Sequence, residues 1–274
     1  MGVFMTFTSS TIQANGITQH YYRSGGNKPP LVLMHGFTDD GACWFPLAEH
    51  LTQEYDVIMP DARGHGLSAR IDGIGFSNEM LADDTAAFIQ ALGLNRPAVM
   101  GHSMGAFNAM ITAAKYPDLI HCLLLEDPPL LPPLGTGGAA ARRPDLREWG
   151  NNLRRMQQTS LEDLIAEEQQ RSPRWSAAEL RAGADSKYRV DARVFEAHAL
   201  MPAWELFMQR VQCPVLLIYG ETSFIDDAIA QEAAAVWTTG QAVKISQAGH
   251  CVHRDNFADS LQAVQTFLRE TYPA

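Results

Sequence analysis

Residues 101–105 read Gly-His-Ser-Met-Gly, and this pentapeptide separates two segments of different character. The apolar run from Pro97 to Met100 before it is typical of a buried strand, whereas residues 104–115 after it favour a helix. Gly-x-Ser-x-Gly at a strand-to-helix turn is the pattern of a nucleophile elbow, in which small flanking residues let two backbones pass closely. Ser103 would then stand at the amino end of a helix, where the helix dipole favours negative charge. The pattern predicts a serine nucleophile.

Strand-like and helix-like segments alternate on both sides of this turn. Strands are predicted at residues 3–9, 17–23, 31–34, 55–59, 97–100, 120–125, 215–219 and 242–246, and helices at residues 42–52, 78–93, 104–115, 226–237 and 258–271. The Asn15-Gly16 dipeptide predicts a hairpin between the first two strands. Near-continuous apolar strands that alternate with helices are typical of a parallel sheet covered on both faces. We therefore expect an α/β fold with a mostly parallel sheet.

The alternation stops after residue 128. Prolines at positions 128, 129, 132 and 133 are followed by a glycine-rich patch at residues 135–138, and residues 141–209 show only helical periodicity. The sheet pattern resumes after Cys213-Pro214. We therefore predict a core of residues 1–128 and 210–274 with an inserted helical cap, or lid, at residues 129–209. The substrate would lie between the cap and the core, because small-molecule pockets are common at such interfaces.

Four motifs make the chain similar to the α/β-hydrolase fold superfamily, in the family's order and over nearly the whole length. They are His35-Gly36 after the first core strand, the segment Asp-Ala-Arg-Gly-His-Gly at residues 61–66, the elbow, and Gly249-His250 near the end. The resemblance implies the α/β-hydrolase fold and a serine, an acid and a histidine in that order along the chain. It also implies that His250 is the general base, and that the backbone N–H groups of Phe37 and Met104 form the oxyanion hole.

The position of the acid departs from the family's common pattern. Many members carry an aspartate three residues after the glycine that ends a late core strand; here that glycine is Gly220, and the position holds Ser223. Asp127 instead ends the strand after the nucleophile helix, and both strand ends open onto the same edge of the sheet. In this feature the chain resembles the 2-(acetamidomethylene)succinate hydrolases and a zearalenone lactone hydrolase. We predict Asp127 as the acid; the alternatives that remain open are Asp226, Glu126 and Glu221.

Composition argues against several classes of protein. The chain has 274 residues, with 21 Lys and Arg against 31 Asp and Glu and a formal charge of −10, so no basic surplus exists for nucleic acid. No apolar run approaches the roughly 18 residues of a membrane span. The first basic residue is Arg23, and the cysteines are scattered, which favours a cytoplasmic location with reduced thiols. Metal-ligand spacings and nucleotide-binding glycine motifs are absent from the sequence, so we expect neither metal nor cofactor.

These observations together predict a cofactor-independent serine hydrolase that cleaves a small-molecule ester, lactone or amide. The same residues would also serve a carbon–carbon bond hydrolase, a cofactor-free haloperoxidase or a slow-turnover ligand sensor. The paired arginines at the start of the cap would suit a substrate carboxylate. The residues that we expect to line the pocket are His35, Trp44, His102, Arg142, Arg143 and Trp149. We expect a small-molecule substrate as the partner, and a monomer or homodimer.

Overall fold

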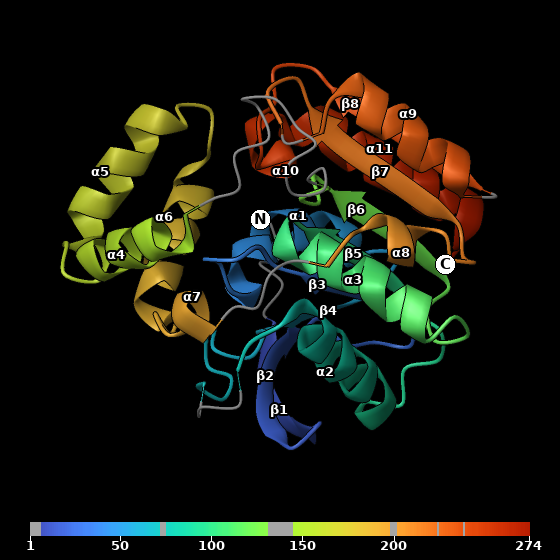
Figure 1. Cartoon of the computed structure of the whole chain (residues 1–274), viewed down its shortest axis with the longest axis horizontal. Helices are drawn as coiled ribbons and strands as arrows, with labels where there is room; N and C mark the ends of the chain where they lie inside the picture. The colour runs from blue at the N-terminus through green and yellow to red at the C-terminus, as the bar shows by residue number, and fades with distance from the viewer. Residues whose placement is uncertain (1–6, 72–74, 131–144, 198–201, 224, 238) are drawn as a thin grey trace.

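The computed structural model describes residues 7–71, 75–130, 145–197, 202–223, 225–237 and 239–274, and within them eight strands form one sheet (Figure 1). The strands are β1 (Thr8–Ala14), β2 (Ile17–Arg23), β3 (Pro30–Met34), β4 (Asp56–Pro60), β5 (Ala98–His102), β6 (Cys122–Glu126), β7 (Val215–Gly220) and β8 (Gly240–Ile245). Their order across the sheet is β1-β2-β4-β3-β5-β6-β7-β8. The β1–β2 and β2–β4 pairs are antiparallel, and the pairs from β4–β3 to β7–β8 are parallel. The predicted mostly parallel sheet is therefore confirmed.

The sheet begins with a tight hairpin. Ala14 pairs with Ile17, and Asn15 and Gly16 between them have φ angles of 47° and 75°. A two-residue turn between twisted strands requires this left-handed backbone, which Asn and Gly adopt readily. The turn forms where the sequence predicts it, but β1 spans Thr8–Ala14 rather than residues 3–9, because pairing runs directly up to the turn. Residues 1–6 lie outside the described part of the chain.

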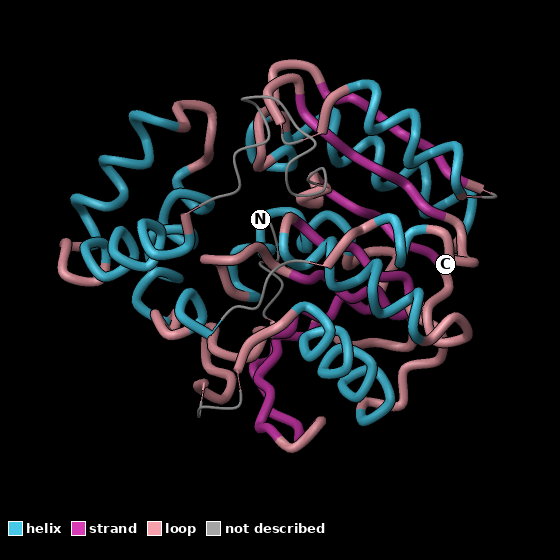
Figure 2. The backbone as a smooth tube through the Cα atoms, in the orientation of Figure 1, coloured by secondary structure: helices cyan, strands magenta, loops and turns pink. Residues whose placement is uncertain are grey.

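Helices cover both faces of the sheet (Figure 2). The helices that pack on one face are α2 (Asn78–Ala91), α3 (Met104–Lys115), α8 (Glu205–Met208) and α9 (Asp227–Val236). Those on the other face are α1 (Phe45–Leu51) and α11 (Phe257–Thr271). The strands β4, β5, β6 and β7 lie between these two apolar layers and are buried at every residue. Burial on both faces explains why their sequences are nearly continuous apolar runs.

Most of the helices between β6 and β7 lie beside the sheet. They are α4 (Leu146–Met156), α5 (Leu161–Arg171), α6 (Ala177–Ser186) and α7 (Val194–Ala197), on the left of Figure 1. An apolar cluster joins them to the core, with Leu153 and Val194 packed near Phe76 and Met104. The last helix before β7 differs, since Phe207 of α8 belongs to the buried cluster around α3. The helices α4–α7 are the part that we call the cap; its limits at residues 129 and 209 stay a prediction.

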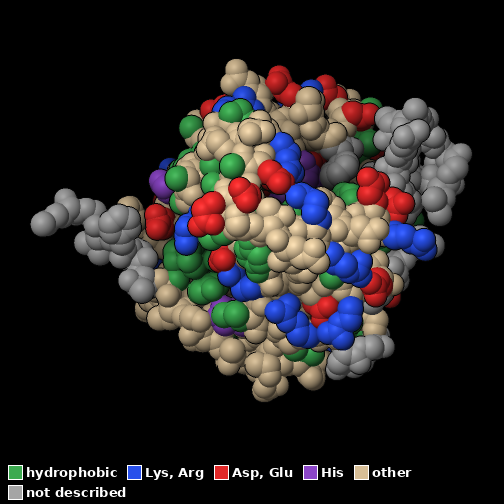
Figure 3. All heavy atoms as spheres, turned by 90° about the vertical axis from the view of Figure 1, so that its left-hand side faces the viewer, with side chains coloured by type: hydrophobic (Ala, Val, Ile, Leu, Met, Phe, Trp, Pro, Cys, Tyr) green, Lys and Arg blue, Asp and Glu red, His purple; other side chains and the backbone are tan. Residues whose placement is uncertain are grey.

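The outer surface of the cap carries both signs of charge side by side (Figure 3). Arg155 pairs with Glu167, and Arg171 pairs with Glu167 and Glu168. Ion pairs this exposed contribute little to stability, so we expect these pairs within the cap to add little to it. Among the helices of the described residues, none combines the length and the apolar character needed to cross a membrane.

Candidate active site

The turn from β5 into α3 has the geometry of a nucleophile elbow. Ser103 has φ 51° and ψ −115°, a backbone conformation that costs about 1–3 kcal/mol in a residue other than glycine. A Cβ atom on Gly101 would lie 2.4 Å from the Ala106 nitrogen, and one on Gly105 would lie 2.2 Å from the Met34 carbonyl oxygen. The close approach of the backbones therefore requires both glycines, as the sequence pattern predicts.

Ser103 is the first member of a hydrogen-bonded chain of three side chains. Nε2 of His250 lies 3.0 Å from Oγ of Ser103, and Nδ1 of His250 lies 2.6 Å from Oδ2 of Asp127. Ser103 follows β5, Asp127 follows β6, and His250 stands between β8 and α10 (Val252–Asp255). The structure thus brings together the three residues that the sequence predicts as nucleophile, acid and base.

Asp127 is fully buried and held on two sides. Its backbone N–H donates to the carbonyl oxygen of Ile218 in β7 at 2.8 Å. Its Oδ1 atom accepts a hydrogen bond from the hydroxyl of Ser223. Ser223 stands at the position where many members of the superfamily carry their acid. The residue found there in place of the common aspartate therefore supports Asp127, a contact that the sequence analysis did not anticipate.

The other three carboxylates considered as the acid have different partners. Asp226 caps α9 by accepting a hydrogen bond from the N–H of Ile229 at 2.8 Å. Glu221 accepts one from the N–H of Gln247 at 2.8 Å. Glu126 faces His253. Each carboxylate is engaged by another group, which leaves Asp127 facing His250.

A second acid–histidine pair lies directly beside the first. Nδ1 of His253 lies 2.8 Å from both carboxylate oxygens of Glu126, and the backbone N–H of His253 donates to the same carboxylate at 3.0 Å. Burial acts to raise the pKa of Glu126, but the facing His253 outweighs burial and lowers that pKa to about 2. Glu126 precedes Asp127, and His253 follows His250 by three residues. The pair therefore fastens the loop that carries His250 to the end of β6.

His102 and the loop after β3 complete the surroundings of Ser103. The Nε2–H group of His102 donates to the carbonyl oxygen of His250 at 3.0 Å, and burial lowers the pKa of His102 to about 3. Nε2 of His65 lies 2.6 Å from the carbonyl oxygen of Phe37. Met104 is the first residue of α3, so its N–H has no acceptor within the helix.

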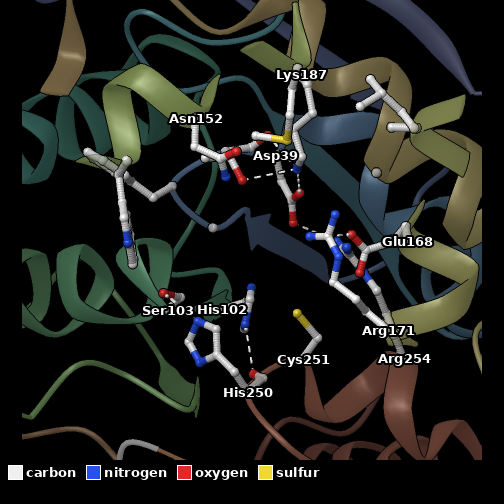
Figure 4. Close-up of a pocket in the computed structure, with 18 of the residues that line it drawn as sticks. Asp39, His102, Ser103, Asn152, Glu168, Arg171, Lys187, His250, Cys251 and Arg254 are labelled. Atoms are coloured by element: carbon white, nitrogen blue, oxygen red, sulfur yellow. Dashed lines mark hydrogen bonds and ion pairs between the residues drawn. The ribbon is translucent and has the colours of Figure 1, made fainter. Parts of the chain in front are cut away.

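The cavity in front of Ser103 has a volume of about 300 Å³, at the lower end of the range for small-molecule pockets. Core residues, including Phe37, His102 and His250, line one part of it, and cap residues, including Trp149, line another. Figure 4 shows Ser103 and His250 on one side of this space and Asp39, Lys187 and Arg254 on another. The cavity therefore lies between the core and the helices α4–α7.

Two of the predicted pocket residues do not line this cavity. His35 turns away, and its Nε2 accepts a hydrogen bond from the N–H of Ala62 at 2.9 Å. Trp44 is buried in the core and stacks on His253 with the ring centres 4.5 Å apart. Both predictions were wrong, because a strand-ending turn and the apolar core take up these side chains. The arginines at positions 142 and 143 lie outside the described residues.

Three charged side chains that the sequence analysis missed meet on the far wall of the cavity (Figure 4). Asp39 accepts hydrogen bonds from Nζ of Lys187 at 3.1 Å and from Nη2 of Arg254 at 2.6 Å. Burial acts to raise the pKa of Asp39, but Arg254 and Lys187 hold it well below its usual value. The ring of Trp175 lies 4.9 Å from the guanidinium of Arg254. We call these three charged residues the Asp39 cluster.

A model of the alpha/beta hydrolase fold family matches residues 29–257. The chain belongs to the α/β-hydrolase fold family. It is 29% identical to 2-(acetamidomethylene)succinate hydrolase of Mesorhizobium japonicum over 281 aligned positions, which cover 96% of this chain and 95% of that protein. It is 39% identical to N-formylmaleamate deformylase of Pseudomonas putida over 122 residues, which are 44% of this chain and 46% of the relative.

The crystal structure of N-formylmaleamic acid deformylase from Pseudomonas putida S16 has a similar fold. Its TM-score is 0.80 at 25% identity, with 94% of this chain and 100% of the other covered. The resemblance inferred from the four motifs is therefore confirmed. As a member of the α/β-hydrolase fold family, this chain is similar over its length to enzymes named as hydrolases.

Proposed function

We propose that this chain is a serine hydrolase that cleaves a small-molecule ester, lactone or amide, with an amide as the first candidate. The observation that carries the proposal is the hydrogen-bonded chain from Ser103 through His250 to Asp127 at the wall of a cavity. The amide is favoured because the relatives are named for a formyl amide and an acetamido compound.

The first half of the reaction forms an acyl-enzyme. Oγ of Ser103 attacks the substrate carbonyl carbon while Nε2 of His250 takes the hydroxyl proton. The Asp127 carboxylate accepts the Nδ1–H hydrogen bond, which fixes the tautomer and stabilises the imidazolium. The carbonyl oxygen becomes an oxyanion that accepts hydrogen bonds from the N–H groups of Phe37 and Met104. The C–N or C–O bond then breaks, and His250 gives its proton to the leaving nitrogen or oxygen.

The second half of the reaction uses water in place of the hydroxyl. Nε2 of His250 takes a proton from water as the water oxygen attacks the acyl carbon. The bond to Oγ breaks, and His250 returns the proton to Ser103. The products are a carboxylic acid and the amine or alcohol released earlier, and the three side chains are back in their starting state.

The variant Ser103→Ala tests this proposal. We expect it to fold normally and to lose about four or more decades of kcat, which is on the order of 5–8 kcal/mol of transition-state stabilisation. Turnover of N-formylmaleamate, 2-(acetamidomethylene)succinate and p-nitrophenyl acetate is measured for both proteins. Retained turnover within tenfold of wild type would exclude a serine nucleophile.

The number of turnovers distinguishes a hydrolase from a ligand sensor that carries the same three side chains. A hydrolase releases many equivalents of p-nitrophenol per chain, whereas a sensor stops after about one acylation. Labelling by a fluorophosphonate that depends on Ser103 shows only that the serine is reactive, so sustained release is the deciding measurement.

A further inference from the structure

The charges of the Asp39 cluster do not balance. One carboxylate, Asp39, faces two cations, Lys187 and Arg254, and the Asp39 and Arg254 side chains are both at least nine-tenths buried. The cluster therefore carries one excess positive charge beside the cavity. An uncompensated charge away from water is costly, so such a site favours a bound anion.

The hydrogen-bond donors of Lys187 are already in use. Its Nζ atom donates to Asp39 at 3.1 Å, and to the carbonyl and hydroxyl oxygens of Thr38 at 3.0 Å each. An ammonium group has three N–H donors, so Lys187 has none left for a ligand. Lys187 contributes charge to the cluster and fixes the position of Asp39.

Arg254 is not saturated in this way. Its Nη2 donates to Asp39 at 2.6 Å, its Nε donates to Nε2 of His253 at 3.3 Å, and Trp175 covers one face of the guanidinium. Among the described residues, Nη1 of Arg254 meets no hydrogen-bond acceptor, although only 4% of the residue is exposed. Arg254 lines the cavity. A buried guanidinium whose free N–H groups face a cavity is suited to a planar anion.

Space for that anion lies next to Gly183 of α6. Gly183 also lines the cavity, and a Cβ atom added to it would lie 3.6 Å from Nη1 of Arg254. Asp39 stands two residues after Phe37, so the Cα atoms of these two residues lie within about 7 Å of each other. Ser103 and Arg254 line the same cavity, so one small molecule in it can contact both.

We propose that Arg254 binds a carboxylate of the substrate, so that the enzyme selects short acyl compounds that carry a carboxylate group. This inference rests on the proposed hydrolase function and names its substrate class. The carboxylate accepts hydrogen bonds from Nη1 of Arg254 and balances the second cation of the Asp39 cluster. The scissile carbonyl then lies at Ser103, a short distance along the same molecule.

Succinate and its neutral diamide, succinamide, are the probes. Both are tested as inhibitors of p-nitrophenyl acetate hydrolysis, and their affinities are also measured by calorimetry without any substrate. We expect wild type to bind succinate at least tenfold more tightly than succinamide, and more tightly than inorganic phosphate. We expect Arg254→Met to weaken succinate binding by about ten- to a hundredfold with little effect on succinamide, because charge-assisted hydrogen bonds are lost.

Gly183→Ala keeps the test valid if Arg254→Met fails to fold. Alanine is a better helix former than glycine, and its methyl group would stand in the space beside Nη1 of Arg254. We expect it to lower the succinate preference at least fivefold. The matched control is Arg181→Met, which removes one exposed positive charge of α6 outside this cavity and leaves both affinities unchanged.

Three outcomes would overturn the inference: equal affinities for succinate and succinamide in wild type, tighter binding of phosphate than of succinate, or unchanged succinate preference in both cavity variants. Failure of the proposed function has a different signature. In that case no ester or amide is turned over, while calorimetry still reports succinate binding that depends on Arg254.

Discussion

Asparagine has nearly the shape of aspartate, so Asp127→Asn tests the role of the carboxylate with little change in packing. Asp127 lies 2.6 Å from Nδ1 of His250, and an amide in that place can select the wrong imidazole tautomer. We expect kcat to fall by about three to four decades while the circular dichroism spectrum stays the same. Asp226→Asn is the control, because that residue caps α9; we expect its kcat to stay within about tenfold of wild type. A larger loss of kcat in Asp226→Asn than in Asp127→Asn would assign the role of the acid to the loop after β7.

Ser223 allows a sharper test of the same site. Its hydroxyl donates to Asp127, so the two side chains meet although they follow different strands. We expect the double variant Asp127→Ser/Ser223→Asp, which exchanges the two residues, to have a kcat/KM at least tenfold higher than that of Asp127→Ser alone. The reason is that a carboxylate at position 223 extends toward the place that Asp127 vacates. A double variant no better than Asp127→Ser would show that position 223 cannot reach the imidazole.

The elements that carry these residues are fastened by the Glu126–His253 pair, which joins the end of β6 to α10. His253→Leu leaves the buried Glu126 carboxylate without its side-chain donor. Breaking a buried pair from one side costs about 3–5 kcal/mol, so we expect a large fall in the free energy of unfolding by urea. We also expect a lower kcat, since the loop that carries His250 is no longer held.

His253→Asn separates positioning from general instability, because its amide nitrogen takes the place of Nδ1 and can still donate to Glu126. We expect this variant to recover most of the lost kcat. Arg155→Leu, on the outer surface of the cap, breaks an exposed pair and should change the free energy of unfolding by less than about 1 kcal/mol. Equal stability losses in His253→Leu and Arg155→Leu would show that the buried pair does not hold the loop.

Local patterns predicted the elements around Ser103 well, because close backbone contacts restrict the residues there. The helix after the elbow was predicted at residues 104–115, which are its observed bounds. The prediction of His250 rested on the resemblance to the α/β-hydrolase family, and that of Asp127 on the same resemblance and on the strand ends of a parallel sheet, which meet at one edge. His35 and Trp44 were misplaced, since nearness to a motif along the chain does not say which way a side chain turns.

The Asp39 cluster is a property of the whole molecule rather than of any segment. Asp39 stands two residues after Phe37, Arg254 follows His250 by four residues, and Lys187 directly follows the cap helix α6. Only the packing of the cap on the core brings these three residues together. Asp39 and Arg254 stand close in sequence to Phe37 and His250, and this nearness could have suggested them as site residues. The sequence around Lys187 gives no such indication.

The stability of the whole molecule should depend on pH through two buried groups. The pKa of His102 is lowered to about 3 by burial, and that of Glu126 is lowered to about 2 by His253 against the effect of burial. As the pH falls below about 6.5, the unfolded chain takes up a proton at His102 that the folded chain refuses; below about 4.5 the same holds for Glu126. We therefore expect the free energy of unfolding to fall from pH 6.5 toward pH 2, with a slope of up to about 1.4 kcal/mol per pH unit for each group.

Urea unfolding at a series of pH values measures this slope. In His102→Gln the histidine contribution disappears, so we expect a flatter profile between about pH 6.5 and 3, with a Glu126 contribution still present below about pH 4.5. An identical profile in the variant and in wild type would assign the acid sensitivity to other groups.

The contact between Ser223 and Asp127 also restricts the order in which descendants of this chain could relocate their acid. If aspartate arises at position 223 first, two carboxylates meet and share one proton, since neighbouring like charges raise the pKa of one of them. The imidazole keeps an anionic partner throughout, and Asp127 can later be lost at small cost. If Asp127 is lost first, the lineage passes through a chain without an acid, which is slower by about three to four decades. Selection for activity therefore admits one of the two mutational orders, gain before loss.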